Sequence, residues 1–405
     1  MTNGIELQVG RNTWAFTVPQ EKAVFRRPAP PPPPLSAAVA PRELVRAALE
    51  APFEFEPLRR ALTPDDTVTV VLDTDLPDAA ELLAGVLEHL ATAGIAPVAV
   101  TVVTAPGARQ DWIDALPDEF ADVKAETHDP GDPNKLAYLA TTQSERRIYL
   151  NRALVDADFV ILVTGRGYDP LTDYAGAEAA VFPALASTEV RAGVVGQFTT
   201  GAPSSDPSEL RADALEIAYL LGTPFLVQAI EGPGHTVAEV VAGLLGSGDE
   251  GVRRQDARWR GSVADRPATV VAAVSGDPAR VTFLDLAKAA ACAARVVESG
   301  GRIAVLSDAA PLLGEGAALL RSLDGPRGAY KRLRRVKPAD WAACFLWAFA
   351  AKRASLFLAS GYPDDVVEGL FATPLHTASE VQRLVDAADS VLVIPDAHKT
   401  MLDVE

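Results

Sequence analysis

Several charged side chains stand directly after apolar runs of the sequence that are typical of β-strands. Asp73 follows the run at 67–72, and Arg109 closes the segment TAPGAR that follows the run at 97–103. In open α/β sheets, ligands bind beyond the carboxyl ends of the strands. Glycine, proline, aspartate and serine dominate these strand ends, and the same residues also make ordinary turns. The pattern therefore predicts a cleft, with Asp73 and Arg109 as candidate ligand-binding residues, but it names no reaction.

A lysine on a predicted helix is the third candidate for ligand binding. Lys288 lies in the otherwise apolar sequence LAKAAACAARVV. Asp285 precedes it by three residues, so a surface ion pair worth only ~0.2–0.5 kcal/mol is the alternative interpretation. Asp73 has the alternative of capping the helix that follows it, and Arg109 that of an exposed surface arginine. The sequence leaves both interpretations open for each of the three residues.

The five histidines are isolated in the sequence and form no recognisable metal site. They are His89, His128, His235, His376 and His398. None has another histidine or a cysteine at the helical or loop spacing of a metal-ligand pair. The chain also lacks a Walker A sequence and a G-x-S-x-G nucleophile elbow, and no G-x-G-x-x-G dinucleotide motif stands directly after a predicted strand. We therefore expect no bound metal, and motifs assign no catalytic residue.

Short β-branched runs alternate with longer amphipathic stretches from residue 67 onward. The runs lie at 67–72, 97–103, 158–163, 192–198, 268–274, 302–307, 355–359 and 390–395. Helices are predicted at 41–51, 78–93, 208–221, 236–245 and 282–298, and a hairpin at 5–18. Continuous apolar strands are buried on both faces, as in parallel sheets covered by helices. The predicted fold class is therefore α/β, with mainly parallel, helix-covered sheets.

The chain length of 405 residues favours two domains with a cleft between them. The segment 246–266 is polar and rich in glycine, aspartate and arginine, and we place the domain boundary at its end. The predicted domains are then residues 1–266 and 267–405. The first would contain the hairpin and a proline-rich connector at 28–35, which polyproline II geometry would stiffen.

The formal net charge of −17 narrows the range of partners. Nucleic acids and anionic membranes both attract cationic surfaces, so we expect neither as a partner. We expect the basic stretch at 331–337 to be a solvated helix face or turn. The two cysteines, Cys292 and Cys344, lie in apolar helical sequence and are expected to be buried and reduced. The sequence shows no signal peptide and no span of the ~20 apolar residues that a membrane requires. We therefore expect a cytoplasmic protein of undetermined oligomeric state.

The order of the motifs resembles the nickel-dependent lactate racemase family over nearly the whole chain. TVTVVLD followed by TDLP is similar to that family's strand and D-x-T-R-P, and TAPGAR stands where the family has G-T-H-R. DPLTDYAGAEAAVFPA occupies the place of P-H and G-G-x-K. In the second half, FLDLAKAAACAARVVESGGRIAVLS and SVLVIPDAHKTM resemble the C-terminal domain. The resemblance implies two α/β domains and a relation to isomerases that racemise or epimerise 2-hydroxy acids.

The same resemblance implies a cofactor for which this chain lacks the residues. Those racemases tether a pincer-like nickel nucleotide to a lysine, use a histidine as a nickel ligand, and use two further histidines as acid and base. The acid and base positions fall on Ala108 and near Leu171. The lysine position falls on Ala179, or on Glu178 if the register shifts by one, and the segment 187–193 contains no histidine. We therefore expect neither the nickel-pincer cofactor nor its hydride-transfer chemistry.

At other positions, this chain has the same kind of side chain as the family. Asp73 and Lys288 match charged positions at the family's cleft, and Arg109 lies at or one place before the family's arginine. His128 matches a His-Asp pair, for which we expect a structural role in a loop. The arginine of D-x-T-R-P, in contrast, falls on Leu76.

Three hypotheses follow, and they leave open whether the chain is an enzyme. In the first, a lactate-racemase-like protein binds a small hydroxy acid or another small anionic metabolite between its domains, without the nickel chemistry. In the second, it is an active isomerase with a rebuilt site. The acidic residues that could serve such a site are Asp73, Asp169, Asp173 and Glu178. In the third, it is a non-catalytic interaction partner.

Overall fold

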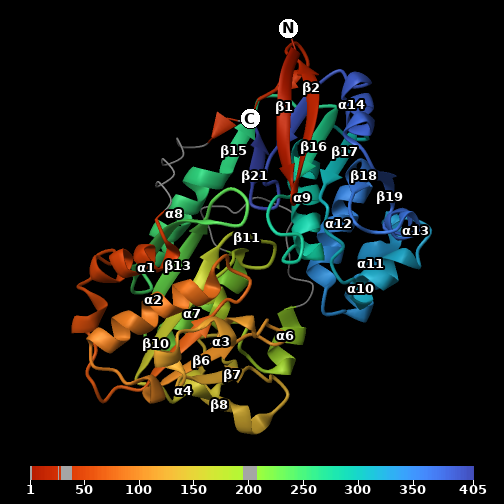
Figure 1. Ribbon diagram of the computed structural model, residues 1–405. Helices are drawn as coiled ribbons and strands as arrows, with labels where there is room; N and C mark the ends of the chain where they lie inside the picture. Colours follow the sequence, from red (N-terminus) through yellow and green to blue (C-terminus); the bar gives the residue numbers. More distant parts are fainter. Residues whose placement is uncertain (1, 26, 29–38, 195–207) are drawn as a thin grey trace.

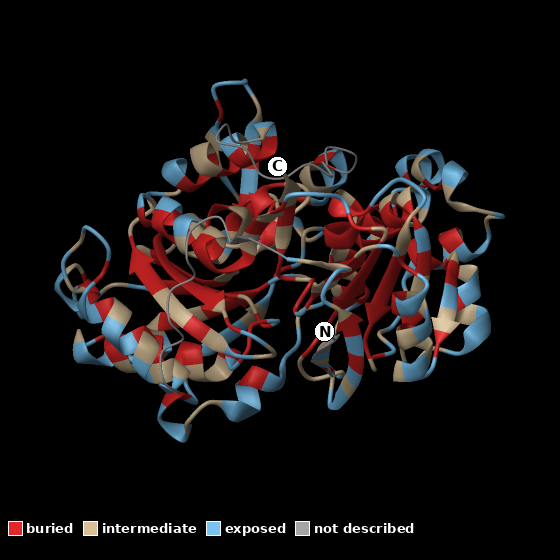
Figure 2. Cartoon of the chain, turned by 90° about the horizontal axis from the view of Figure 1, so that it is seen from above, coloured by how far each residue is buried: buried red, intermediate tan, exposed pale blue. Residues whose placement is uncertain are grey.

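Two six-stranded sheets form the centres of the two domains. The computed structural model describes residues 2–25, 27–28, 39–194 and 208–405. Helices surround both sheets (Figure 1), and buried residues fill the centre of each (Figure 2). Nearly all neighbouring strands within the two sheets run parallel. The predicted α/β class is therefore confirmed.

The first sheet has the strand order β14-β13-β10-β5-β6-β7, and only β14 runs antiparallel to its neighbour. Its strands are β5 (Val68–Leu72), β6 (Val100–Thr104), β7 (Lys124–Thr127), β10 (Phe159–Arg166), β13 (Phe225–Glu231) and β14 (Val237–Gly243). The helices of this domain are α1 (Pro41–Glu50), α2 (Ala79–Thr92), α3 (Asp111–Ala115), α4 (Arg152–Val155), α5 (Glu178–Val181), α6 (Thr188–Val194) and α7 (Glu209–Leu220). Both faces of β5 are buried, with Val70 in the core beneath α2 and Val71 in the core beneath α5 and α7.

The second sheet is wholly parallel, in the order β19-β18-β17-β16-β20-β3. Its strands are β16 (Thr269–Ala273), β17 (Arg302–Leu306), β18 (Ser355–Ala359), β19 (Ala372–Leu375), β20 (Val391–Ile394) and β3 (Ala23–Val24). Its helices are α9 (Phe283–Val296), α10 (Glu315–Arg321), α11 (Ala329–Val336), α12 (Trp341–Arg353), α13 (Asp364–Gly369) and α14 (Ala378–Asp386). Two faces are again covered, because Val270 packs with α9 and Val271 packs with the N-terminal hairpin.

The N-terminal hairpin, β1 (Thr2–Val9) and β2 (Asn12–Pro19), packs against the second sheet (Figure 1). Leu7, Val9, Phe16 and Val18 form its buried face, as the alternating sequence predicts. Strand β3, which follows the hairpin, completes the second sheet, whose other strands come from the second half of the chain. The proline run at 30–34, predicted to be a stiff connector, lies outside the described residues.

The polar segment that we placed at the domain boundary is folded rather than open. Its larger part is helix α8 (Ser247–Trp259), followed by β15 (Arg260–Val263). The arginines that made the segment look solvent-exposed are engaged in ion pairs. Arg258 lies 2.6 Å from Glu239, and Arg254 lies 3.0 Å from the same carboxylate. β15 then pairs with β21 (Met401–Val404) and β4 (Arg27–Pro28) in a small third sheet.

Two element predictions were wrong. Most of the segment 236–245 forms strand β14 (Val237–Gly243) instead of a helix, because its three valines continue the sheet beside β13, with Leu226 opposite Gly243. Of the strand predicted at 192–198, residues 192–194 end helix α6, and the rest lies outside the described residues. The strand beside β10 is instead β13, whose apolar run FLVQAIE we did not predict as a strand.

Candidate functional site

A cavity of about 220 Å³ lies between the two domains, beyond the carboxyl ends of their central strands. Residues that follow β5, β10 and β13 line it from the first domain, and residues that follow β16 and β20 line it from the second. The start of α9 completes its wall. We call this space the interdomain cavity. Its residues that matter below are Asp73, Asp75, His235, Arg280, Lys288 and His398.

Lys288, which we proposed from the sequence as a ligand-binding candidate, lines the interdomain cavity from α9. The helix begins at a capping box in which the Asp285 carboxylate accepts hydrogen bonds from the backbone nitrogen of Thr282 (2.8 Å) and from its hydroxyl (2.7 Å). Asp285 is therefore engaged in the cap. Within the described part of the chain, no ion pair joins it, or any other carboxylate, to Lys288. A half-buried cation without a fixed partner is a suitable contact for an anion.

Asp73 lies at the end of β5 and is shared by two cavities. Its carboxylate accepts hydrogen bonds from the backbone nitrogens of Asp75 (3.1 Å) and Gly165 (3.5 Å). Burial, with a smaller contribution from the charge of Asp75, raises the pKa of Asp73 to about 6. Burial also raises the pKa of Asp75, and the charge of Asp285 acts in the same direction, whereas Arg109, Arg280 and Lys288 oppose it.

Two histidines that the sequence analysis left unassigned meet in the interdomain cavity. His235 comes from the turn between β13 and β14, and His398 follows β20. Nε2 of His235 and Nδ1 of His398 are buried and have no hydrogen-bond partner among the described residues. Burial is the main cause that lowers the pKa of each, to about 3 for His398. The strand-end position of His398 was a signal for the site, whereas His235 follows a strand that we had missed.

A lysine next to His398 joins the two domains. Nζ of Lys399, which follows β20, lies 2.8 Å from the Glu231 carboxylate at the end of β13. It also donates to the carbonyl oxygens of Gly232 (3.0 Å) and Gly234. From the same loop, Asp396 accepts a hydrogen bond from the Gly234 nitrogen at 3.1 Å. These contacts hold the turn that carries His235 against the loop that carries His398.

A second cavity, of about 390 Å³, adjoins the first and lies wholly in the first domain. Alanine, proline and leucine side chains supply most of its lining, so we call it the apolar cavity. Ala108, Leu171 and Ala179 all line it, although they are far apart in sequence. These are the positions at which the resemblance places two histidines and the tethering lysine. The cavity thus brings together the positions that the motif order had singled out.

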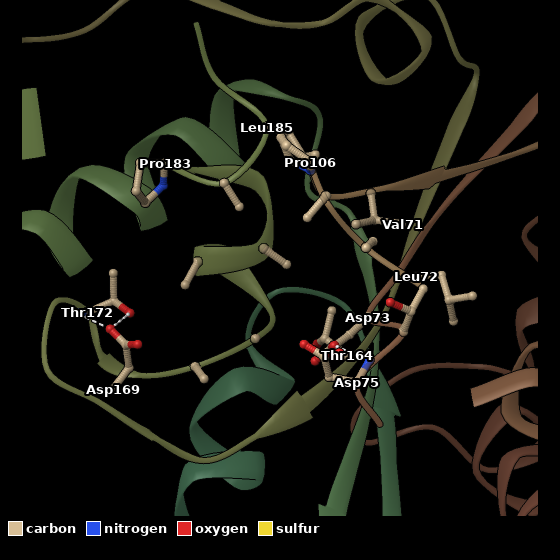
Figure 3. Close-up of a pocket in the computed structure, with 18 of the residues that line it drawn as sticks. Val71, Leu72, Asp73, Asp75, Pro106, Thr164, Asp169, Thr172, Pro183 and Leu185 are labelled. Carbon is tan, nitrogen blue, oxygen red and sulfur yellow. Dashed lines mark hydrogen bonds between the residues drawn. The ribbon is translucent and has the colours of Figure 1, made fainter. Parts of the chain in front are cut away.

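The charged residues of the apolar cavity are all carboxylates. They are Asp73, Asp75 and Asp169, and no lysine, arginine or histidine is among the described residues that line the cavity. Figure 3 shows Asp169 beside Thr172 at one side, and Asp73 and Asp75 near Thr164 at another. An anionic nucleotide would meet repulsion here, with no amine to tether it and no imidazole to hold nickel. The residues present do not fit the family's nickel nucleotide.

The remaining acidic candidates have structural partners. Asp169 accepts hydrogen bonds from the backbone nitrogens of Leu171 (2.8 Å) and Thr172 (2.9 Å), which forms a turn. Asp173 accepts a hydrogen bond from the nitrogen of Ser208 at 2.8 Å, at the start of α7.

Glu178 is the most buried of these carboxylates. It lies between Arg166 and Arg211, at 3.1 Å from each. Burial alone would raise the pKa of Glu178, but the two guanidinium groups outweigh it and hold the pKa below its usual value.

Arg109 and His128 do not line the interdomain cavity, although the charge of Arg109 reaches Asp75. Arg109 donates to Asp111 at 2.7 Å on the surface and lines neither cavity. His128 is buried, with Nε2 3.1 Å from the Ala186 carbonyl oxygen and Nδ1 3.3 Å from Asn151. These contacts give His128 the structural place that we expected. Cys292 and Cys344 are both buried.

Comparison with known proteins adds to this geometry. Residues 9–192 match the family model of the lactate racemase N-terminal domain. The chain is lactate-racemase-like. None of the curated proteins matches it in sequence. The region that matches the family model, residues 9–192, includes β5, β6, β10 and α5, and therefore the elements that build the apolar cavity.

Two solved structures share the fold of this lactate-racemase-like chain. The lactate racemase apoprotein from Thermoanaerobacterium thermosaccharolyticum matches with a TM-score of 0.80 at 16% identity, over 99% of this chain and 100% of that one. A protein from Thermotoga maritima matches with a TM-score of 0.67 at 14% identity, over 91% of this chain and 100% of that one. At such identities the likeness concerns the fold alone.

None of the helices described here combines the length and apolar character that crossing a membrane requires.

Proposed function

We propose that this lactate-racemase-like protein binds a small carboxylate, such as a hydroxy acid, in the interdomain cavity and does not use nickel-pincer hydride transfer. Lys288 is the main contact. The single observation that carries the proposal is that Lys288 lines this cavity and has no ion-pair partner among the described residues. Arg280 adds a second positive charge from the same domain. A cytoplasmic location and the lack of nucleic-acid or membrane partners remain predictions from the sequence.

The apolar cavity supports the second half of the proposal. Ala108, Leu171 and Ala179 offer neither imidazole nor amine, and the neighbouring charges are carboxylates. The structural contacts of the acidic residues also leave fewer carboxylates available to a rebuilt isomerase site. Glu178 is bound between two arginines, Asp169 is part of a turn, and Asp173 accepts a hydrogen bond at the start of α7. Of the four acidic candidates this leaves Asp73, which lines both cavities together with Asp75.

A titration with lactate, malate, phosphate and sulfate tests the proposal, read by NMR shifts and by thermal shift. We expect dissociation constants in the millimolar range, because the position of the family's bidentate arginine falls on Leu76. Lys288→Met should weaken binding roughly tenfold or more, since it removes a charge-assisted contact. Lys331→Met is the matched control, because Lys331 is exposed on α11 and lines neither cavity. Binding that is unchanged by Lys288→Met would refute the assignment.

A further inference from the structure

The two histidines of the interdomain cavity can form hydrogen bonds that the proposed contact between Lys288 and a carboxylate does not use. Nε2 of His235 and Nδ1 of His398 are each buried without a hydrogen-bond partner among the described residues, and both side chains line the cavity that contains Lys288. A buried polar atom without a partner is costly, so such atoms occur mainly where a ligand or water completes them. Here two of them, from opposite domains, belong to residues that line one small space.

Burial is the main cause that lowers the pKa of both imidazoles and so favours their neutral forms, and the surrounding charges act in both directions. Around His398, the charges of Lys399, Lys288 and His235 oppose protonation, and only Asp285 favours it. Around His235, Arg280 and Lys399 oppose protonation, whereas Glu231 and Asp78 favour it. A neutral imidazole has one nitrogen that donates and one that accepts. Such a pair is suited to an uncharged polar group, not to a second carboxylate.

A hydroxyl group matches two neutral imidazoles better than a carbonyl does. The hydroxyl can donate to one ring nitrogen and accept from the other, whereas a carbonyl can only accept. Lys288 and Arg280 line the same cavity and can hold a carboxylate. A volume of about 220 Å³ limits the ligand to a small molecule in which the two groups are close together.

We infer that His235 and His398 are specificity-determining residues that bind a hydroxyl group on the small carboxylate held by Lys288. The inference rests on the proposed function, because it requires a carboxylate in the interdomain cavity. The backbone brings the two histidines into position. The loop after β16 turns at Gly276, whose φ of +103° favours glycine, and there it lies beside the turn that carries His235. Lys399 and Asp396 hold the turn of His235 from the other domain.

The test compares lactate with propionate, which differ in the hydroxyl group alone. The wild-type protein should bind lactate about tenfold more tightly than propionate, the ratio that corresponds to ~1.4 kcal/mol. His235→Leu and His398→Leu should each reduce this ratio towards one by weakening lactate and leaving propionate unchanged. His376→Leu is the control, because His376 is exposed near Asp364 and lines neither cavity.

Ring resonances of the wild-type protein provide a second readout that does not depend on how the variants fold. The signals of His235 and His398 should move with lactate and much less with propionate, while those of His376 stay in place. Equal binding of lactate and propionate that still requires Lys288 would overturn the inference and leave the proposed function intact. A preference for lactate that survives both histidine substitutions would also overturn it. Failure of both acids to bind would refute the proposed function and the inference together.

Discussion

The ammonium group of Lys399 lies 2.8 Å from the carboxylate of Glu231 and joins the two domains beside the candidate site. The lysine side chain is only 8% exposed, and its Nζ also donates to backbone carbonyl oxygens of the Glu231 strand end. Buried ion pairs add modest net stability, but the loss of one partner leaves an uncompensated charge. The contact therefore serves mainly to fix how the domains meet.

Lys399→Met should destabilise the protein while retaining the length of the side chain. We expect a loss of ~2–4 kcal/mol in the free energy of unfolding at pH 7, because Glu231 and two carbonyl oxygens lose their partner. Urea denaturation measures it. Lys135→Met is the control, since Lys135 forms a surface pair with Glu126 at 3.2 Å and should cost less than ~1 kcal/mol. Equal losses in the two variants would argue against the interdomain role.

Carboxylate affinity should fall as pH rises through about 6, where Asp73 loses its proton. The raised pKa means that Asp73 is neutral below this pH and adds a negative charge to the cavity above it. We expect lactate to bind roughly threefold to tenfold more weakly at pH 7.5 than at pH 5. Asp73→Asn should make the profile flat. A profile that keeps its slope in Asp73→Asn would assign the titration to another group.

Glu178→Gln should cost stability without changing lactate affinity. The substitution leaves Arg166 and Arg211 buried without their carboxylate, so we expect a loss of ~3–5 kcal/mol at pH 7. Because the folded protein lowers the pKa of Glu178, its contribution is present above the pKa of the unfolded chain and is lost as pH falls below it. Glu43→Gln, which changes an exposed pair with Arg46, should be nearly neutral. Loss of a measurable isomerase activity in Glu178→Gln, with its stability retained, would favour a rebuilt acidic site.

Protein produced in a host that makes the nickel nucleotide should carry neither stoichiometric nickel nor an adduct on any lysine. Intact mass and metal analysis measure both. Ala179→Lys alone should not restore racemisation of lactate, because Ala108 and Leu171 still lack imidazoles and such groups act as a unit. An adduct mass on the wild-type chain would refute this expectation directly.

Much of the fold could be predicted because its cause is local in the sequence. Continuous apolar runs such as 67–72 are buried on both faces of the sheet, and Thr282 caps α9 as its sequence favours. Residues 236–245 show the limit of such reasoning, since their pairing with β13 overrides their helical spacing. No local pattern indicates that the polar arginines of α8 are neutralised by Glu239 on another element.

Part of the candidate site could also be predicted, because two of its residues have local signals in the sequence. Asp73 and Lys288 follow from strand ends and from one cation in an apolar helix, and both reach the interdomain cavity. His235 and His398 could not be paired, because only the meeting of two domains places them together. Arg109 shows the reverse case, since a strand-end position did not prevent it from pairing with Asp111 at the surface.

The N-terminal hairpin implies a particular order of events during synthesis. Its apolar face, formed by Leu7, Val9, Phe16 and Val18, leaves the ribosome well before β16 and α14, on which it packs. Strand β3 can join its sheet only after β20 has been synthesised, because among the described strands it pairs with β20, with Val391 opposite Ala23. The first sheet can assemble in the meantime, since all its strands are translated before the second sheet exists. The apolar face of the hairpin must remain uncovered throughout that interval, so nascent chains should be most prone to aggregation or chaperone binding there.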